Sequence, residues 1–394
     1  MVIQLPRVQQ TLVEFLLLVR RPAECEIDQR LGGKMKSHGM IVRCAGPMVA
    51  LAILGFQGQL AHAQAKGVSD TVQVHVVITN EAVQDGGDTP LLTAQNVTVT
   101  QGKTPLKVTQ VLPAKGESAA LLLFILIDDT CDTSIGNNLS DIKDFVNAQP
   151  ATTMFAVGYM SNANVQIAQD YTADHALVVK AIRLPRGTLS SSDSPYLSLI
   201  SLLKRLPETK VRRQILMVSD GIDRLRGTNG PQGMATGMGS SRNMYAGMGS
   251  TRNMTAISPM NATMDTISID VDTASQTAQR YGIQVHGIYA PGVGRLGRNA
   301  WEAQLGQSGV GQIADESGGE YFALGNQQQV NFKNYLDRIQ KIIDNQYYLV
   351  FDARPKKKAG LQRIKISSDA PGSEIAAPDN VWVPAIEDVG NAKK

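Results

Sequence analysis

The sequence has little of what zinc, redox and membrane proteins need. It holds three cysteines and five histidines in 394 residues, and no histidine has a cysteine or second histidine at zinc-ligand spacing. No run of about 20 apolar residues is present to cross a bilayer. There is no G-x-S-x-G motif and no P-loop. A formal net charge of +3 without a basic stripe disfavours a nucleic-acid partner, so a globular protein of another class is expected.

Residues 1–65 predict an N-terminal extension with a signal peptide. Lys36 and Arg43 precede an apolar stretch from Pro47 to Phe56, and an A-x-A cleavage pattern ends at Ala63. A signal counted from Met1 would exceed the usual ~15–30 residues, so translation is expected to start at Met35 or Met40.

Export would decide the redox state and the location of the mature chain. Cleavage after Ala63 removes Cys25 and Cys44, which leaves Cys131 without an internal disulfide partner. The mature protein is then expected to be secreted or periplasmic, with no integral membrane segment.

Hydrophobic periodicity divides the rest of the chain into three parts. Residues 66–117 alternate apolar and polar side chains, which predicts a small β module. Residues 118–345 alternate buried strands with helical stripes, which predicts an α/β domain with a doubly wound, mostly parallel sheet. Residues 346–394 return to a β-hairpin pattern with a tail, so β-rich segments flank the domain.

A low-complexity insertion interrupts the α/β pattern at 227–264. It contains the near-repeats GMGSSRNMYA and GMGSTRNMTA and holds seven of the fourteen methionines. Its Gly and Ser content predicts a mobile Met-rich loop. Thioethers bind Cu(I), but Met also forms adaptable contact surfaces, and the contact surface is the preferred interpretation.

Polar residues gather where two buried strands end. LLLFILI runs into Asp128, Thr130 and Asp132, and QILMVS ends at Asp220. Between them in sequence, Ser194 precedes a proline and a predicted helix. Because ligands bind outside the carboxyl ends of strands in open α/β sheets, these side chains could form one site. Each also has a local explanation, as a turn or a helix cap, and capping is strongest for Ser194.

The order of these motifs resembles the von Willebrand factor type A domain, and the flanks resemble secreted bacterial proteins of the VWFA-related, acidobacterial type. The resemblance covers most of residues 70–385. It implies a metal-ion-dependent adhesion site in which Asp128 and Asp220 are the aspartates, Thr130 the first hydroxyl and Ser194 the threonine. Asp132 replaces the second serine, so the site is degenerate.

Charge repulsion gives a separate argument for a bound cation. Three carboxylates about 4 Å apart would repel pairwise by about 4 kcal/mol at an effective dielectric near 20. A hard cation, proton uptake or backbone N–H donors must relieve this repulsion. All-oxygen ligands suit Mg²⁺, Mn²⁺ or Ca²⁺, so a divalent cation with ligands Asp128, Thr130, Asp132, Ser194 and Asp220 is the expected cofactor.

Enzymatic alternatives fit the residues less well. A haloacid-dehalogenase-type phosphatase using Asp128 needs a second acid where Thr130 stands. A response-regulator receiver domain needs a phosphoacceptor aspartate, which this sequence does not offer at the expected strand end. It also needs a cytoplasmic location, which the predicted signal peptide disfavours. GVGRLG, 292–297, matches a dinucleotide motif, but no acid follows the next predicted strand.

The sequence therefore predicts an exported, non-enzymatic binding or adhesion module. Its expected partner is a protein or cell-surface ligand, bound through an acidic residue that completes the cation's shell. A metal-free interaction domain of the same fold is the alternative.

Overall fold

The computed structural model describes residues 71–82, 89–226, 269–293, 300–322 and 331–385. The predicted signal peptide, the Met-rich insertion and most of GVGRLG lie outside these ranges. Among the described helices, none has the length and apolar character needed to cross a membrane.

Six strands form the central sheet, in the order β6-β5-β4-β7-β8-β9. Neighbouring strands are parallel except at the edge, where β6 runs antiparallel to β5. The strands are β4 (Leu121–Asp128), β5 (Thr153–Ser161), β6 (Asn164–Thr172), β7 (Arg212–Ser219), β8 (Gln284–Tyr289) and β9 (Tyr321–Phe322). The predicted mostly parallel α/β fold is confirmed.

Strand β4 lies in the interior of the sheet because it is apolar on both faces. Each side chain from Leu121 to Ile127 is at most 3% exposed. A strand covered on both faces needs apolar residues at every position, unlike the alternating pattern of a half-exposed strand. The run therefore places the polar residues after Asp128 at the carboxyl edge of the sheet.

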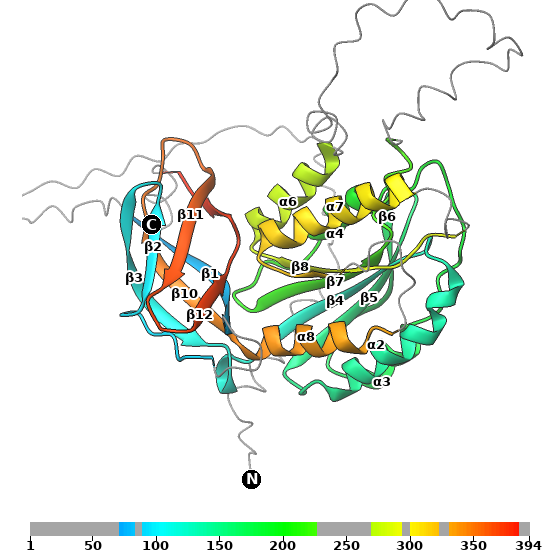
Figure 1. The fold of residues 1–394 in the computed structure, drawn as a ribbon, viewed down its shortest axis with the longest axis horizontal. Helices are drawn as coiled ribbons and strands as arrows, with labels where there is room; N and C mark the ends of the chain where they lie inside the picture. Colours follow the sequence, from blue (N-terminus) through cyan, green and yellow to red (C-terminus); the bar gives the residue numbers. More distant parts are fainter. Residues whose placement is uncertain (1–70, 83–88, 227–268, 294–299, 323–330, 386–394) are drawn as a thin grey trace, which may run out of the picture. The chain divides into compact units, whose positions relative to one another are not determined.

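Helices cover both faces of the central sheet (Figure 1). On one face lie α2 (Gly136–Ala148), α3 (His175–Ala181) and α8 (Lys333–Asp344), whose apolar side chains join the β4 core. On the other lie α4 (Pro195–Leu203), α6 (Ile269–Tyr281) and α7 (Ala300–Ser317). Short 3-10 turns occupy η1 (Gly116–Ser118) and η2 (Thr133–Ile135).

Seven further strands form the flanking sheet, in the order β12-β1-β10-β3-β2-β11-β13. They are β1 (Val72–Ala82), β2 (Val97–Gln101), β3 (Thr104–Pro113), β10 (Gln346–Ala353), β11 (Gly360–Ser368), β12 (Ser373–Ala376) and β13 (Asn380–Val383). The β module and the C-terminal hairpin expected as separate segments thus share one sheet. Strand β10 lies between β1 and β3, and Val74, Ile78 and Phe351 share its apolar core.

A buried arginine links the two sheets. Arg212, at the start of β7, is 3% exposed and donates to the carbonyls of Ala119 and Ile343 at 2.7 and 3.0 Å. Its Nη1 also donates to Gln346 Oε1 at 2.7 Å. Ile343 lies in the last turn of α8, where the helix dipole favours a cation. The guanidinium therefore joins β7, α8 and β10 without a carboxylate partner among the described residues.

One imidazole lies in the core of the central sheet. His286 of β8 is fully buried, and its Nδ1 accepts a hydrogen bond from Glu320 N at 3.2 Å. Burial lowers the pKa of His286 to about 4, because the charged imidazolium would lose its hydration. The ring is therefore neutral at physiological pH.

Candidate functional site

Asp128 is the centre of a buried hydrogen-bond cluster at the carboxyl edge of β4. Its Oδ1 accepts from Thr130 N at 2.9 Å and from Thr130 Oγ1 at 2.8 Å. Its Oδ2 accepts from Ser219 Oγ, at the end of β7, at 2.6 Å. Burial, then the charge of Asp220, raise the pKa of Asp128 to about 6 against these hydrogen bonds. Part of the charge repulsion expected from the sequence is thus relieved by easier proton uptake.

Asp220 is paired with an arginine from its own loop. Arg224 Nη2 lies 2.5 Å from Asp220 Oδ2, and Nη1 lies 3.4 Å from Asp220 Oδ1. Both side chains are buried, at 7% and 1% exposure. Burial alone would lower the pKa of Arg224, but Asp220, Asp128 and Asp193 outweigh it and raise the pKa. The guanidinium is therefore the positive charge of this cluster.

Close backbone approaches hold the Asp220 loop in place. Gly221 has φ +67 and lies against Gly306 of α7, where a Cβ on either glycine would overlap the other's backbone region. A Cβ on Gly292, after β8, would overlap Asp220 Oδ2 and Arg224 Nη2. Tyr196 Oη donates to Gly221 O at 2.6 Å. The loop is thus fixed by α4, α7 and the segment after β8.

Asp132 and Ser194 act as helix caps. Asp132 Oδ1 accepts from Ser134 N at 2.8 Å and caps η2, and its own N–H donates to Pro291 O at 2.8 Å. Ser194 Oγ accepts from Leu197 N at 3.3 Å, with Pro195 at the first position of α4. The capping alternative thus describes the side-chain bonds of both residues. No described bond joins either side chain to Asp128 or Asp220.

A divalent cation at Asp220 would compete with the guanidinium of Arg224. Every carboxylate oxygen of Asp128 and Asp220 accepts a hydrogen bond from the protein, and a guanidinium already neutralises Asp220. Within the described ranges, no group of three His, Cys, Asp or Glu side chains could hold a metal ion. Mg²⁺ and Ca²⁺ need several free oxygen ligands around one point. The expected cation stays a prediction for direct measurement.

A second ion pair lies beside the cluster. Arg183 Nη1 and Nη2 donate to the two oxygens of Asp129 at 2.7 and 2.9 Å, and the guanidinium lies 3.6 Å from the Tyr159 ring centre. Arg186 Nε is 3.8 Å from the same carboxylate. This bidentate pair fixes the 183–187 segment over the end of β4, where Gly187 N donates to Asp129 O.

Exposed leucines stand in the loops around this edge. Leu184, Leu189 and Leu225 are 51%, 47% and 46% exposed. Leu225 follows Arg224 directly and its N–H donates to Asp193 O at 3.0 Å. Leu184 lies near Gly136 at the start of α2. The edge thus has exposed leucines in the loops outside its buried polar cluster.

The sequence alone does not indicate that Ser219 and Arg224 belong to the cluster. Ser219 is the last residue of a predicted buried strand, and Arg224 follows Asp220 by four residues. That spacing signals an ion pair in a helix, whereas here it spans a loop. That Arg224 is buried after the end of a strand can be predicted only when the conformation of the loop is known.

No family model and no curated protein matches the chain. Similar solved structures include an aerotolerance-related membrane protein from Bacteroides fragilis, with 13% identity, TM-score 0.35 and coverage of 57% of this chain and 99% of that one. The SpRpn10 VWA domain has 12% identity, TM-score 0.31 and coverage of 56% and 95%. A von Willebrand factor type A protein from Catenulispora acidiphila has 10% identity, TM-score 0.32 and coverage of 82% and 75%. The solved structures to which this chain is similar thus include von Willebrand factor type A domains, the family that its motifs resemble.

Proposed function

We propose that the protein is a non-enzymatic interaction module whose partner binds at the carboxyl edge of the central sheet. The observation that carries this proposal is the buried Asp220–Arg224 pair beside Asp128. A resident guanidinium already compensates the charge of Asp220, and we infer that partner binding does not require a divalent cation. The edge is held rigid by its own side chains and backbone contacts.

The surrounding leucines supply the contact surface. Leu184, Leu189 and Leu225 present apolar area on loops that the buried cluster fixes. We infer that these three side chains contribute to one contact surface, because protein-protein contacts bury apolar side chains of this kind. The partner is therefore a protein or a surface ligand, and the mature chain meets it in the periplasm or outside the cell.

A catalytic role for Asp128 has less support. Asp128 is 2% exposed, and both its oxygens accept hydrogen bonds. A nucleophilic carboxylate must reach its substrate within about 3 Å. This burial supports the non-enzymatic proposal by disfavouring a nucleophilic role for Asp128.

Calorimetry with Mg²⁺ and Mn²⁺ tests the metal-free part of the proposal. The wild-type protein should give no binding heat, and neither should Asp220→Ala. Micromolar binding by the wild type that Asp220→Ala abolishes would restore the expected metal site and overturn the role of Arg224.

A pull-down from the envelope fraction tests the surface. Retained partners should be unchanged by a chelator and lost with Leu189→Glu/Leu225→Glu. The matched control is Leu91→Glu, since Leu91 is 66% exposed in a loop before β2 of the flanking sheet. Equal retention by the surface variant and the control would refute the assignment of this edge.

A further inference from the structure

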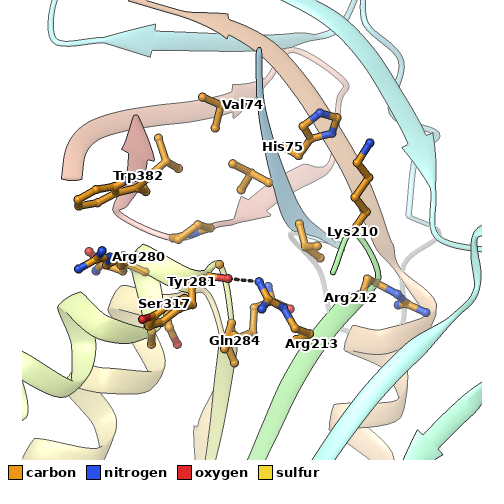
Figure 2. A pocket seen from close by; sticks show the side chains of 18 of the residues that line it. Val74, His75, Lys210, Arg212, Arg213, Arg280, Tyr281, Gln284, Ser317 and Trp382 are labelled. Carbon is orange, nitrogen blue, oxygen red and sulfur yellow. Dashed lines mark hydrogen bonds between the residues drawn. The ribbon is translucent and has the colours of Figure 1, made fainter. Parts of the chain in front are cut away.

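A cationic groove lies between the flanking sheet and the start of β7 and β8, away from the candidate site. It has a volume of about 280 Å³ and is lined by residues of β1, β13, α6 and the segment that enters β7. Lys210, Arg213 and Arg280 line it, and its lining contains no aspartate or glutamate among the described residues. Figure 2 shows Arg280 beside Trp382 on one side of the groove and Lys210 near His75 on the other.

The groove follows a strand edge. Its lining includes the consecutive residues from Gln73 to Val77. Successive side chains of a strand point to opposite faces, so a cavity that touches five residues in a row lies along the edge. On that edge β12 pairs with β1 only from Thr79 to Ala82. From Val72 to Ile78, no described strand pairs with β1 on the side opposite β10.

Two positive side chains of the groove form no ion pair with a described carboxylate. Lys210 and Arg280 form no ion pair with any described residue, and the Arg280 guanidinium lies 4.5 Å from the Trp382 ring centre. Arg213 donates to the carbonyls of Pro207 and Tyr281, and burial lowers its pKa while the charge of Glu208 raises it. Among the described residues, Lys210 and Arg280 therefore offer positive charge to a ligand, whereas Glu208 partly offsets the charge of Arg213.

The strand edge, and not the size of the groove, favours a peptide over a small anion. The volume of about 280 Å³ lies near the lower end of the roughly 300–1,000 Å³ of small-ligand pockets. An open backbone edge with free N–H and C=O groups is the usual template for an added strand. Cationic side chains at both sides would then contact acidic side chains of that strand.

We propose that this groove binds an acidic peptide segment of a partner protein in an extended conformation, paired with β1 between Val72 and Ile78. Backbone hydrogen bonds supply the alignment, and Lys210, Arg213 and Arg280 select acidic side chains. This surface is independent of the one at the carboxyl edge of the central sheet.

The test uses the full chain and a fluorescein-labelled peptide of eight residues that alternates Glu and Val. Fluorescence anisotropy should show binding, with at least tenfold weaker binding of the matching Lys and Val peptide. N-methylation at alternate residues of the acidic peptide keeps its charge but blocks strand pairing, and it should also weaken binding at least tenfold.

Two charge-reversal variants place the site. Lys210→Glu/Arg280→Glu should weaken binding at least tenfold, whereas Lys107→Glu/Lys365→Glu should change it less than twofold, since both control lysines are exposed and lie outside the groove. Circular dichroism checks that each variant is folded.

Three results of the binding assays would each overturn the proposal, and a competition experiment adds a fourth. The three are equal binding of acidic and basic peptides, equal binding of the N-methylated peptide, or equal loss in the groove and control variants. Complete competition by millimolar glutamate or inorganic phosphate would also refute it and assign the groove to small anions.

Discussion

Removing the Arg224 guanidinium should destabilise the protein by about 4 kcal/mol. Arg224 Nη2 lies 2.5 Å from Asp220 Oδ2, and unit charges about 4 Å apart attract each other by about 4 kcal/mol at an effective dielectric near 20. Breaking a buried pair by deleting one partner costs about 3–5 kcal/mol, because the remaining charge is left buried. Arg224→Met keeps much of the apolar stem and removes only the charge and the donors.

Urea unfolding followed by circular dichroism measures this cost, with a double variant as the decisive comparison. Asp220→Asn/Arg224→Met removes both charges, and its amide oxygen can still accept from Ile222 N, as Asp220 Oδ1 does at 2.9 Å. We expect the double variant to recover to within about 1–2 kcal/mol of the wild type.

An exposed pair with the same spacing provides the control. Lys333 Nζ lies 2.9 Å from Asp337, and the two side chains are 68% and 56% exposed. Lys333→Met should cost at most about 0.5 kcal/mol, as exposed pairs do. A cost for Arg224→Met no larger than for Lys333→Met would refute the assignment of Arg224 as the neutralising charge.

Three further predictions concern the core and the loop contacts. Lowering the pH from about 6.5 to 4 should cost on the order of 3 kcal/mol through His286, because the unfolded imidazole takes up a proton in this window while the folded one, with a pKa of about 4, stays neutral. The raised pKa of Asp128 acts in the opposite direction, since it favours the folded state as the pH falls. The loss through His286 is therefore measured as the difference in the free energy of unfolding between the wild type and His286→Gln, by urea unfolding at each pH. Parallel curves of this free energy against pH would contradict the prediction. Arg212→Met should lower the free energy of unfolding by about 2–3 kcal/mol, since two buried acceptors and one half-buried acceptor lose a charged donor, and a cost below about 0.5 kcal/mol in urea would exclude the link between the sheets. Gly306→Ala should lower the melting temperature more than Gly360→Ala, because a Cβ at 306 meets the Asp220 backbone whereas one at 360 meets nothing within 4 Å; equal melting temperatures would contradict the close approach.

Local signals predicted much of the central sheet. The apolar run from Leu121 to Ile127 forms β4, and Ser194 with Pro195 gives both the start and the cap of α4. Such signals depend on burial and on bonds within a few residues, which a single sequence carries.

Long-range pairing was harder to predict. Val72 aligns with Ala353, and nothing in either segment indicates this register. The alternating patterns identified strands on both sides of the α/β domain but not that they share one sheet. Matching two edges across that distance needs the three-dimensional arrangement of the domain between them.

The strand ends predicted where Asp128, Thr130 and Asp220 lie, and the cation expected there stays a prediction. Asp128, Thr130 and Asp220 do meet near one edge, as the strand-end argument expects. The positive charge comes from Arg224, whose position depends on a loop fixed by Gly221, Gly292 and Tyr196. Helices and strands are predicted from the periodic spacing of apolar residues, whereas a loop conformation of this kind has no such periodic pattern.

The place of β10 in the flanking sheet sets the order in which the protein can fold during synthesis. Strands β1 to β3 leave the ribosome first, but β1 and β3 pair with β10 and not with each other. Strands β1 and β3 lack their partner β10 until the whole α/β domain has been translated. Until then, the edges that pair with β10 are open to wrong pairing. A chain truncated before Gln346 would lack β10, so these edges of β1 and β3 would stay unpaired. The flanking sheet therefore depends on a strand that is translated after the α/β domain.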